Sequence, residues 1–332
     1  MAQPFLSQPK VELHVHLEGA IRPATLLHLA ARNGIALPVA CEEDFADWYR
    51  FVDFPHFVEV YLTLTGAIRT EEDIHEVARD FLLEQARQNV LYSEVTYTAQ
   101  TLFAQTGIPF AAQMDAIRAA RDAVRSSHGV SMQLIIDIPR NLSSPDQSQR
   151  TARWVAEAHG DGLVAALGLG GYEVGYPPED FADAFALARE AGVPAVIHAG
   201  ETAGPASIRG ALDALHAVRI GHGTACVTDA ALMDRLREQQ VMLEVCPSSN
   251  LCLGIVPEIA RHPIQAMLDH GLNICINSDD PPLFNTTLTR EYALLSGTFG
   301  YGADFFAARN RAAAEAALLP EAERAALVER LS

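Results

Sequence analysis

Basic residues are scarce in this sequence of 332 residues, in which 24 Lys and Arg residues stand against 42 Asp and Glu residues. The formal net charge of −18 at pH 7 repels phosphate backbones and anionic lipid surfaces, so we expect no nucleic-acid partner and no membrane partner. No run of residues approaches the roughly 20 apolar positions of a membrane-spanning helix. The first residues lack the basic and apolar regions of a signal peptide, and we therefore expect a cytoplasmic protein.

Cysteine is also rare, with five residues and no C-x-x-C pair. Most of the five lie in apolar, strand-like runs. This setting favours reduced core residues over disulfides or thiolate metal ligands. The prediction covers Cys41, Cys226, Cys246, Cys252 and Cys275.

Short apolar runs alternate with helical patterns along the chain, and apolar residues make up 49% of it, which excludes a disordered protein. The predicted strands are Val11–Leu17, Val90–Thr98, Ser131–Pro139, Leu163–Leu169, Ala195–Ala199, Arg219–Gly221, Val241–Cys246 and Asn273–Asn277. Predicted helices between them include Phe110–Ser126, Gln147–His159, Pro178–Ala191 and Asp229–Gln239. This order predicts an α/β protein with the (β/α)₈ TIM-barrel fold. A doubly wound sheet is the alternative, but no G-x-G-x-x-G motif follows the first strand.

The interval between the first two strands is too long for a single crossover helix, so we expect a helical insertion over about residues 35–88. Helical patterns cover Pro23–Asn33, Phe54–Ile68 and Thr70–Arg87, and aromatic residues gather between Phe45 and Tyr61. The insertion either packs around a small core of its own or acts as a lid over the barrel mouth. Further helices are expected outside the barrel over Phe305–Ser332, and residues 1–332 are predicted to form one domain.

Two histidines stand at the end of the first predicted strand, in Glu12-Leu13-His14-Val15-His16-Leu17-Glu18-Gly19. Residues two apart on a strand point the same way, so His14 and His16 project together. A single histidine here would be typical of a core residue. A pair on one face favours metal ligation, because imidazole nitrogen suits Zn²⁺ and its neighbours.

Three more strand ends carry polar side chains. His198 ends an apolar run, and Glu201 follows it as either a helix-start glutamate or a candidate proton donor. His222 lies between two glycines that allow a sharp turn. Asp279 and Asp280 end the last predicted strand before two prolines, either as functional carboxylates or as solvated acids of an Asp-Pro turn.

These strand ends together supply three histidines and a carboxylate for one divalent cation, because a barrel gathers the carboxyl ends of its strands at one face. Zinc fits such a set, as do iron, cobalt and manganese. Lys10 is the only lysine among the 24 basic residues and precedes the first strand. A binuclear centre bridged by a carboxylated mid-chain lysine is therefore excluded, and we expect one metal ion per chain.

The chain resembles the adenosine deaminase family of metal-dependent hydrolases. The stretches that carry the resemblance occur in the family's order and are residues 9–19, His198-Ala199-Gly200-Glu201, Gly221-His222-Gly223, residues 244–250 and Ser278-Asp279-Asp280-Pro281. The resemblance implies a (β/α)₈ barrel with Zn²⁺ bound by His14, His16, His198 and Asp279. The zinc-deaminase signature H-x-E…P-C-x-x-C of another fold is absent.

The resemblance also implies the chemistry. Protonated Glu201 would donate to purine N1, while His222 and Asp280 would orient the water that attacks C6 and relay its proton. Residues expected to contact the substrate are His16, Glu18, Gly171 and Asp280. The expected partner is thus a small purine nucleoside. An inert metal-stabilised binding protein and an amidohydrolase that opens a cyclic amide are the competing hypotheses.

One position bears on the substrate. The family commonly has His-Leu-Asp-Gly, with the aspartate on the ribose 5′-hydroxyl, whereas this sequence has Glu18, one methylene longer. Residues 167–175 and 276–284 resemble bacterial branches that act on adenine or on 6-amino-6-deoxyfutalosine, an adenosine with an aryl group beyond its 5′ carbon. We predict a nucleoside, adenosine or 6-amino-6-deoxyfutalosine, with the free base adenine as the alternative.

Overall fold

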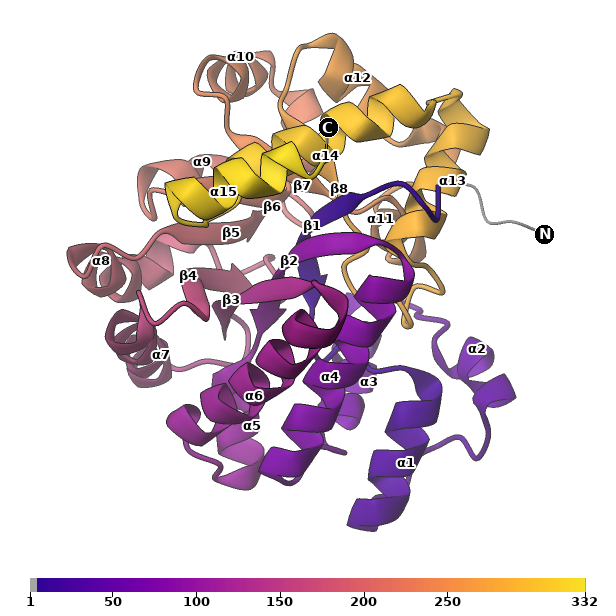
Figure 1. The fold of residues 1–332 in the computed structure, drawn as a ribbon. Coiled ribbons are helices and arrows are strands. Elements are labelled where there is room, and N and C mark those ends of the chain that lie inside the picture. Colours follow the sequence, from indigo (N-terminus) through magenta and orange to yellow (C-terminus); the bar gives the residue numbers. More distant parts are fainter. Residues whose placement is uncertain (1–4, 332) are drawn as a thin grey trace.

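Eight parallel strands form a nearly closed barrel in the computed structural model, which describes residues 5–331 (Figure 1). Each strand pairs with the next along the chain, in the order β1 to β8. The strands are β1 (Lys10–His16), β2 (Val90–Tyr97), β3 (Ser131–Pro139), β4 (Val164–Gly170), β5 (Ala195–Ala199), β6 (Arg219–His222), β7 (Met242–Val245) and β8 (Ile274–Ile276). The predicted TIM-barrel class is confirmed, and the predicted strand ends lie within two residues of those observed.

The last strand has only three residues, and the chain after it completes the ring. The Asn277 side-chain oxygen accepts hydrogen bonds from the backbone N–H groups of Leu13 and His14, at 2.9 and 3.1 Å. Asp279 then forms an isolated parallel bridge with Val15. The residues that join β8 to β1 are therefore the same residues that carry polar side chains into the barrel mouth.

Helices fill the connections between strands. Those before β5 are α1 (Pro23–Asn33), α2 (Phe45–Trp48), α3 (Phe54–Thr65), α4 (Glu71–Arg87), α5 (Ala99–Thr106), α6 (Phe110–His128), α7 (Pro145–Ala158) and α8 (Ala182–Glu190). Those after it are α9 (Pro205–Asp213), α10 (Ala230–Glu238), α11 (Pro247–Cys252), α12 (Ile264–Asp269), α13 (Leu288–Phe299), α14 (Ala303–Ala316) and α15 (Glu321–Glu329). The helix predicted over Pro178–Ala191 begins as a 3₁₀ turn at Pro178–Phe181, because Phe181 departs from helical geometry.

The insertion after β1 and the C-terminal helices lie at opposite ends of the barrel (Figure 1). At one end, α14 contacts β1 and β8, and its Asn310 accepts a hydrogen bond from the Val11 N–H at 2.9 Å. At the other end, Tyr61 of α3 faces His16, with ring centroids 6.4 Å apart. The helical tail is interrupted at Ala317–Pro320, a break that was not predicted from the sequence. It arises because the residue before a proline disfavours helical geometry.

The five cysteines are all free, but only three are core residues. Cys226, Cys246 and Cys275 are buried, as predicted, whereas Cys41 and Cys252 are exposed, so the core prediction is wrong for those two. Cys41 precedes a short 3₁₀ turn of acidic residues, and Cys252 ends the short helix α11, and neither position faces the barrel. Within residues 5–331, no helix is long and apolar enough to cross a membrane.

Candidate metal centre and cavity

Four of the predicted site residues meet at the carboxyl ends of the strands. The nitrogen and oxygen ligand atoms of His14, His16, His198 and Asp279 all lie within 4.8 Å of one another. One Asp279 oxygen, Oδ1, is 3.4 Å from His14 Nε2 and 3.3 Å from His16 Nε2. His16 Nε2 is 3.1 Å from His198 Nε2. The structure therefore brings together the quartet that the sequence resemblance implied.

The hydrogen bonds at the outer side of the quartet leave lone pairs on its inner side. His14 donates from Nδ1 to Glu244 Oε2 at 2.8 Å, and its buried Nε2 has no hydrogen-bond partner in the described part of the chain. His198 donates from Nδ1 to the Leu169 carbonyl at 3.1 Å. Both Nε2 atoms then present lone pairs to the same point as a carboxylate, an arrangement that a divalent cation satisfies. The residues therefore fit one bound cation.

A buried network of ion pairs holds the His14 ring in place. Glu244 accepts the His14 Nδ1–H through one oxygen and the Arg219 Nε–H, at 2.6 Å, through the other. Arg219 also donates to Glu94 at 2.5 Å and to the Ala316 carbonyl at the end of α14 at 3.0 Å. These contacts fix the His14 ring and link it to the helices that cover the far end of the barrel.

Close approach of β6 to the histidines requires a residue without a side chain. A Cβ at Gly221 would lie 2.7 Å from His14 Cε1 and 3.3 Å from the His198 Cα. We expect Gly221→Ala to lower the free energy of unfolding by about 1–3 kcal/mol, because one or both histidines must move. Thermal denaturation and titration with zinc measure the effect.

Gly297→Ala is the matched control. This position lies within α13, and a Cβ there meets nothing within 4 Å. An alanine should stabilise that helix by about 0.5–1 kcal/mol. Equal stability of the wild type and Gly221→Ala, with equal zinc affinity, would contradict the packing argument.

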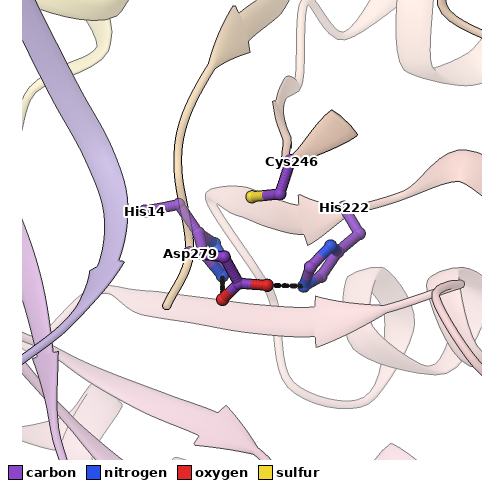
Figure 2. Close-up of side chains that lie close together, drawn as sticks. All are labelled: His14, His222, Cys246 and Asp279. Atoms are coloured by element: carbon purple, nitrogen blue, oxygen red, sulfur yellow. Dashed lines mark ion pairs between the residues drawn. The ribbon is translucent and has the colours of Figure 1, made fainter. Parts of the chain in front are cut away.

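His222 belongs to a second, overlapping group. Figure 2 shows His14, His222 and Cys246 around Asp279, and these four side chains also place ligand atoms within 4.8 Å of one another. His222 Nε2 is 3.9 Å from Asp279 Oδ2 and 3.6 Å from Glu201 Oε2. Burial raises the pKa of the Cys246 thiol well above its usual range, which keeps it a weak ligand.

Glu201 points into the same space from the loop after β5. It is 9% exposed, and its Oε1 has no hydrogen-bond partner among residues 5–331. Burial, followed by the nearby charges of Asp279 and Glu173, raises its pKa well above the usual range of a glutamate. These surroundings favour the protonated carboxyl group, the form that can donate a proton.

The Glu173 side chain builds the loop that carries Glu201. Its carboxylate accepts hydrogen bonds from the backbone N–H groups of Gly200, Glu201 and Thr202, at 2.8–2.9 Å, and from the Ser207 hydroxyl at 2.5 Å. One buried carboxylate thus accepts the hydrogen bonds of three backbone N–H groups in the turn between β5 and α9. No role for Glu173 was predicted from the sequence.

Asp280 is the second carboxylate with a free oxygen. Its Oδ1 has no hydrogen-bond partner among the residues that the structure describes, and burial raises its pKa to about 8. A Cβ at Gly19 would lie 1.6 Å from that oxygen, so only glycine leaves room for Asp280 in this position. The glycine that ends the first motif and the aspartate of the last motif are therefore packed against each other.

Three members of the quartet, His16, His198 and Asp279, line a cavity whose volume, with the solvent at its mouth, is about 690 Å³. His16, Gly171, Glu201, His222 and Asp280 line it, as expected of substrate and catalytic residues. The apolar part of the wall includes Phe54, Phe57, Val58, Leu62, Leu142 and Leu253. Since four of these side chains come from α3, the insertion forms one side of the cavity.

Glu18 lies behind the wall rather than in it. Its carboxylate accepts hydrogen bonds from the Thr98 N–H at 2.9 Å and the Tyr61 hydroxyl at 3.3 Å, and it does not line the cavity. Asp137 of β3 does line the cavity, and its buried Oδ1 has no hydrogen-bond partner within residues 5–331. Asp137 was not predicted as a site residue, although a lone carboxylate within the apolar run Leu134–Ile138 was a signal for it.

Comparisons with known proteins agree with this geometry. The family model described as adenosine deaminase matches residues 9–332. The aminodeoxyfutalosine deaminase of Streptomyces avermitilis is 41% identical over 290 residues, which cover 86% of this chain and 80% of that protein. The crystal structure of adenine deaminase from Arthrobacter aurescens superposes with a TM-score of 0.92 at 32% identity and 98% coverage of both chains. An amidohydrolase from Burkholderia ambifaria with bound zinc gives a TM-score of 0.89 at 28% identity, with 98% of this chain and 93% of that chain covered.

Proposed function

Because this chain belongs to the adenosine deaminase family, we propose that it hydrolyses the 6-amino group of a purine nucleoside, adenosine or 6-amino-6-deoxyfutalosine. In this reaction a C–O bond forms at purine C6 and the C6–N bond breaks, so that water and the amine become a 6-oxopurine and ammonia. The observation that carries the proposal is a buried acid, Glu201, which lines the same cavity as His16, His198 and Asp279 of the quartet.

We propose that His14, His16, His198 and Asp279 hold one divalent cation, zinc first and iron, cobalt or manganese as substitutes. When bound, the cation supplies a Lewis acid that lets water attack at neutral pH. The zinc in the Burkholderia ambifaria structure supports this choice.

The remaining polar residues would handle protons and substrate. Glu201 would keep the proton for purine N1, which offsets the loss of ring aromaticity at C6. His222 and Asp280 would orient the attacking water. Asp137 would accept a hydrogen bond from the substrate through its unpaired oxygen, and Gly171 would pack against the purine.

The cavity wall favours a nucleoside with an apolar extension. The apolar side chains of α3, with Leu142 and Leu253, line the same cavity as His16, His198 and Asp279. A purine base with C6 near the quartet leaves that wall for the rest of the substrate, and the aryl group of 6-amino-6-deoxyfutalosine is apolar enough to use it. The relative from Streptomyces avermitilis supports the same substrate.

Adenine is the second candidate, favoured by the adenine deaminase from Arthrobacter aurescens and by Glu18, which does not line the cavity. We expect kcat/KM for the preferred nucleoside to exceed that for adenine at least about 10-fold, equivalent to 1.4 kcal/mol of transition-state binding. Absorbance assays with 6-amino-6-deoxyfutalosine, adenosine and adenine measure it. A preference for adenine would overturn the nucleoside proposal, and turnover of none of the three would overturn the deaminase proposal for purines.

A further inference from the structure

His222 lies at the end of a chain of hydrogen bonds that leads away from the cavity. Its Nδ1 faces the side-chain nitrogen of Asn250 in α11, at 3.5 Å. The Asn250 oxygen faces His262 Nε2 at 3.1 Å. His262 Nδ1 in turn accepts a hydrogen bond from the backbone N–H of Ile264 at 3.1 Å.

The backbone N–H of Ile264 sets the donor-to-acceptor direction of this whole row of hydrogen bonds. An amide N–H can only donate, so His262 Nδ1 accepts and His262 Nε2 carries the ring proton. His262 Nε2 therefore donates to the Asn250 oxygen, and the Asn250 amide nitrogen is left to donate to His222 Nδ1. Burial lowers the pKa of His262 to about 4, which agrees with a neutral ring.

We propose that Asn250 and His262 are positioning residues that fix the tautomer of His222, with Nδ1 unprotonated and the Nε2–H directed toward Glu201 and Asp279. All three side chains are buried, with 0–3% of their surface exposed, so water does not compete for these bonds. The groups nearest to His222 Nε2 on this side are carboxylate oxygens of Glu201 and Asp279, at 3.6 and 3.9 Å, so Nε2 faces acceptors across a gap longer than a hydrogen bond.

Two consequences follow for the site. A protonated Nε2 has no lone pair for a cation, so His222 is excluded as a ligand and the group that contains Cys246 is disfavoured against the quartet that contains His16. For the reaction, and here the inference rests on the proposed function, His222 donates a hydrogen bond to the attacking water instead of accepting its proton. Asp280 lines the same cavity, and in its ionised form it would accept that proton.

The tautomer can be measured without activity. In metal-free protein labelled with ¹⁵N-histidine, long-range ¹H–¹⁵N spectra distinguish protonated from unprotonated ring nitrogens, and the His222 signals are those lost in His222→Asn. We expect a protonated Nε2 and an unprotonated Nδ1. A protonated Nδ1 in the wild type would overturn the proposal.

Substitutions of Asn250 and His262 can either reverse or preserve the direction of these hydrogen bonds. Asn250→Asp removes the donor, so we expect His222 to gain a proton on Nδ1 and kcat to fall about 10- to 100-fold, with KM close to that of the wild type. His262→Gln keeps a donor for Asn250 and should retain the tautomer, whereas His262→Leu should lose it. Asn310→Asp is the matched control, because Asn310 is 1% exposed and lies in α14, at the other end of the barrel.

The outcomes separate the two proposals. An unchanged His222 tautomer in Asn250→Asp or in His262→Leu would overturn the positioning role, whatever happens to kcat. If Asn250→Asp does not fold, the wild-type spectrum and the pair of His262 variants decide. Should the tautomer match while no purine is turned over, the proposed function fails and the assignment of His222 stands.

Discussion

Replacing Glu201 by glutamine should lower kcat by about 100- to 10,000-fold while the protein still binds its metal ion. Glutamine keeps the size of the side chain and can still form hydrogen bonds in the cavity. It carries no proton that it can give to the substrate, whereas the raised pKa of Glu201 favours the protonated form that can. KM should change much less than kcat, because the donor acts chiefly in the transition state.

Two measurements check this result. Absorbance assays give kcat and KM, and elemental analysis gives the metal content per chain. Glu238→Gln is the matched control, since Glu238 is exposed at the end of α10 and should show wild-type kinetics. A Glu201→Gln enzyme with near wild-type kcat would remove Glu201 as the proton donor.

Removal of the metal ion should abolish turnover, and added zinc should restore it. We expect chelation to bring kcat below detection. His198→Ala should do the same and should also lose the metal ion, because His198 Nε2 is one of the quartet's ligand atoms that face inward. The circular dichroism of the helices should persist in the chelated protein, since the barrel is closed by backbone and Asn277 contacts.

The two variants distinguish the roles of their residues. Glu201→Gln should contain metal and be inactive, whereas His198→Ala should lack metal and be inactive. Restoration with iron, cobalt or manganese in place of zinc tests the choice of metal, which a set of three histidines and an aspartate does not fix. Full activity in a chelated protein with no detectable metal would contradict the metal centre.

The sequence alone predicted the elements that converge. His14 and His16 are two residues apart on a strand, and His198, His222 and Asp279 each follow an apolar run. Parallel strands in a barrel place these ends at one face, so their proximity follows from topology and needs no knowledge of side-chain packing. The insertion between β1 and β2 was predictable for a similar reason, because the interval exceeds one crossover.

Only the tertiary structure decided which side chains hold these strand-end site residues in place. Glu244 meets His14 from 230 residues away, and Asn250 meets His222 from another connection, so only barrel register and rotamers settle these contacts. Glu18 shows the same limit: the resemblance implied a substrate contact for it, and no local pattern indicated that its carboxylate accepts hydrogen bonds from Thr98 and Tyr61. Sequence periodicity fixes the direction in which a residue projects, whereas its partner depends on packing among segments that no local pattern relates.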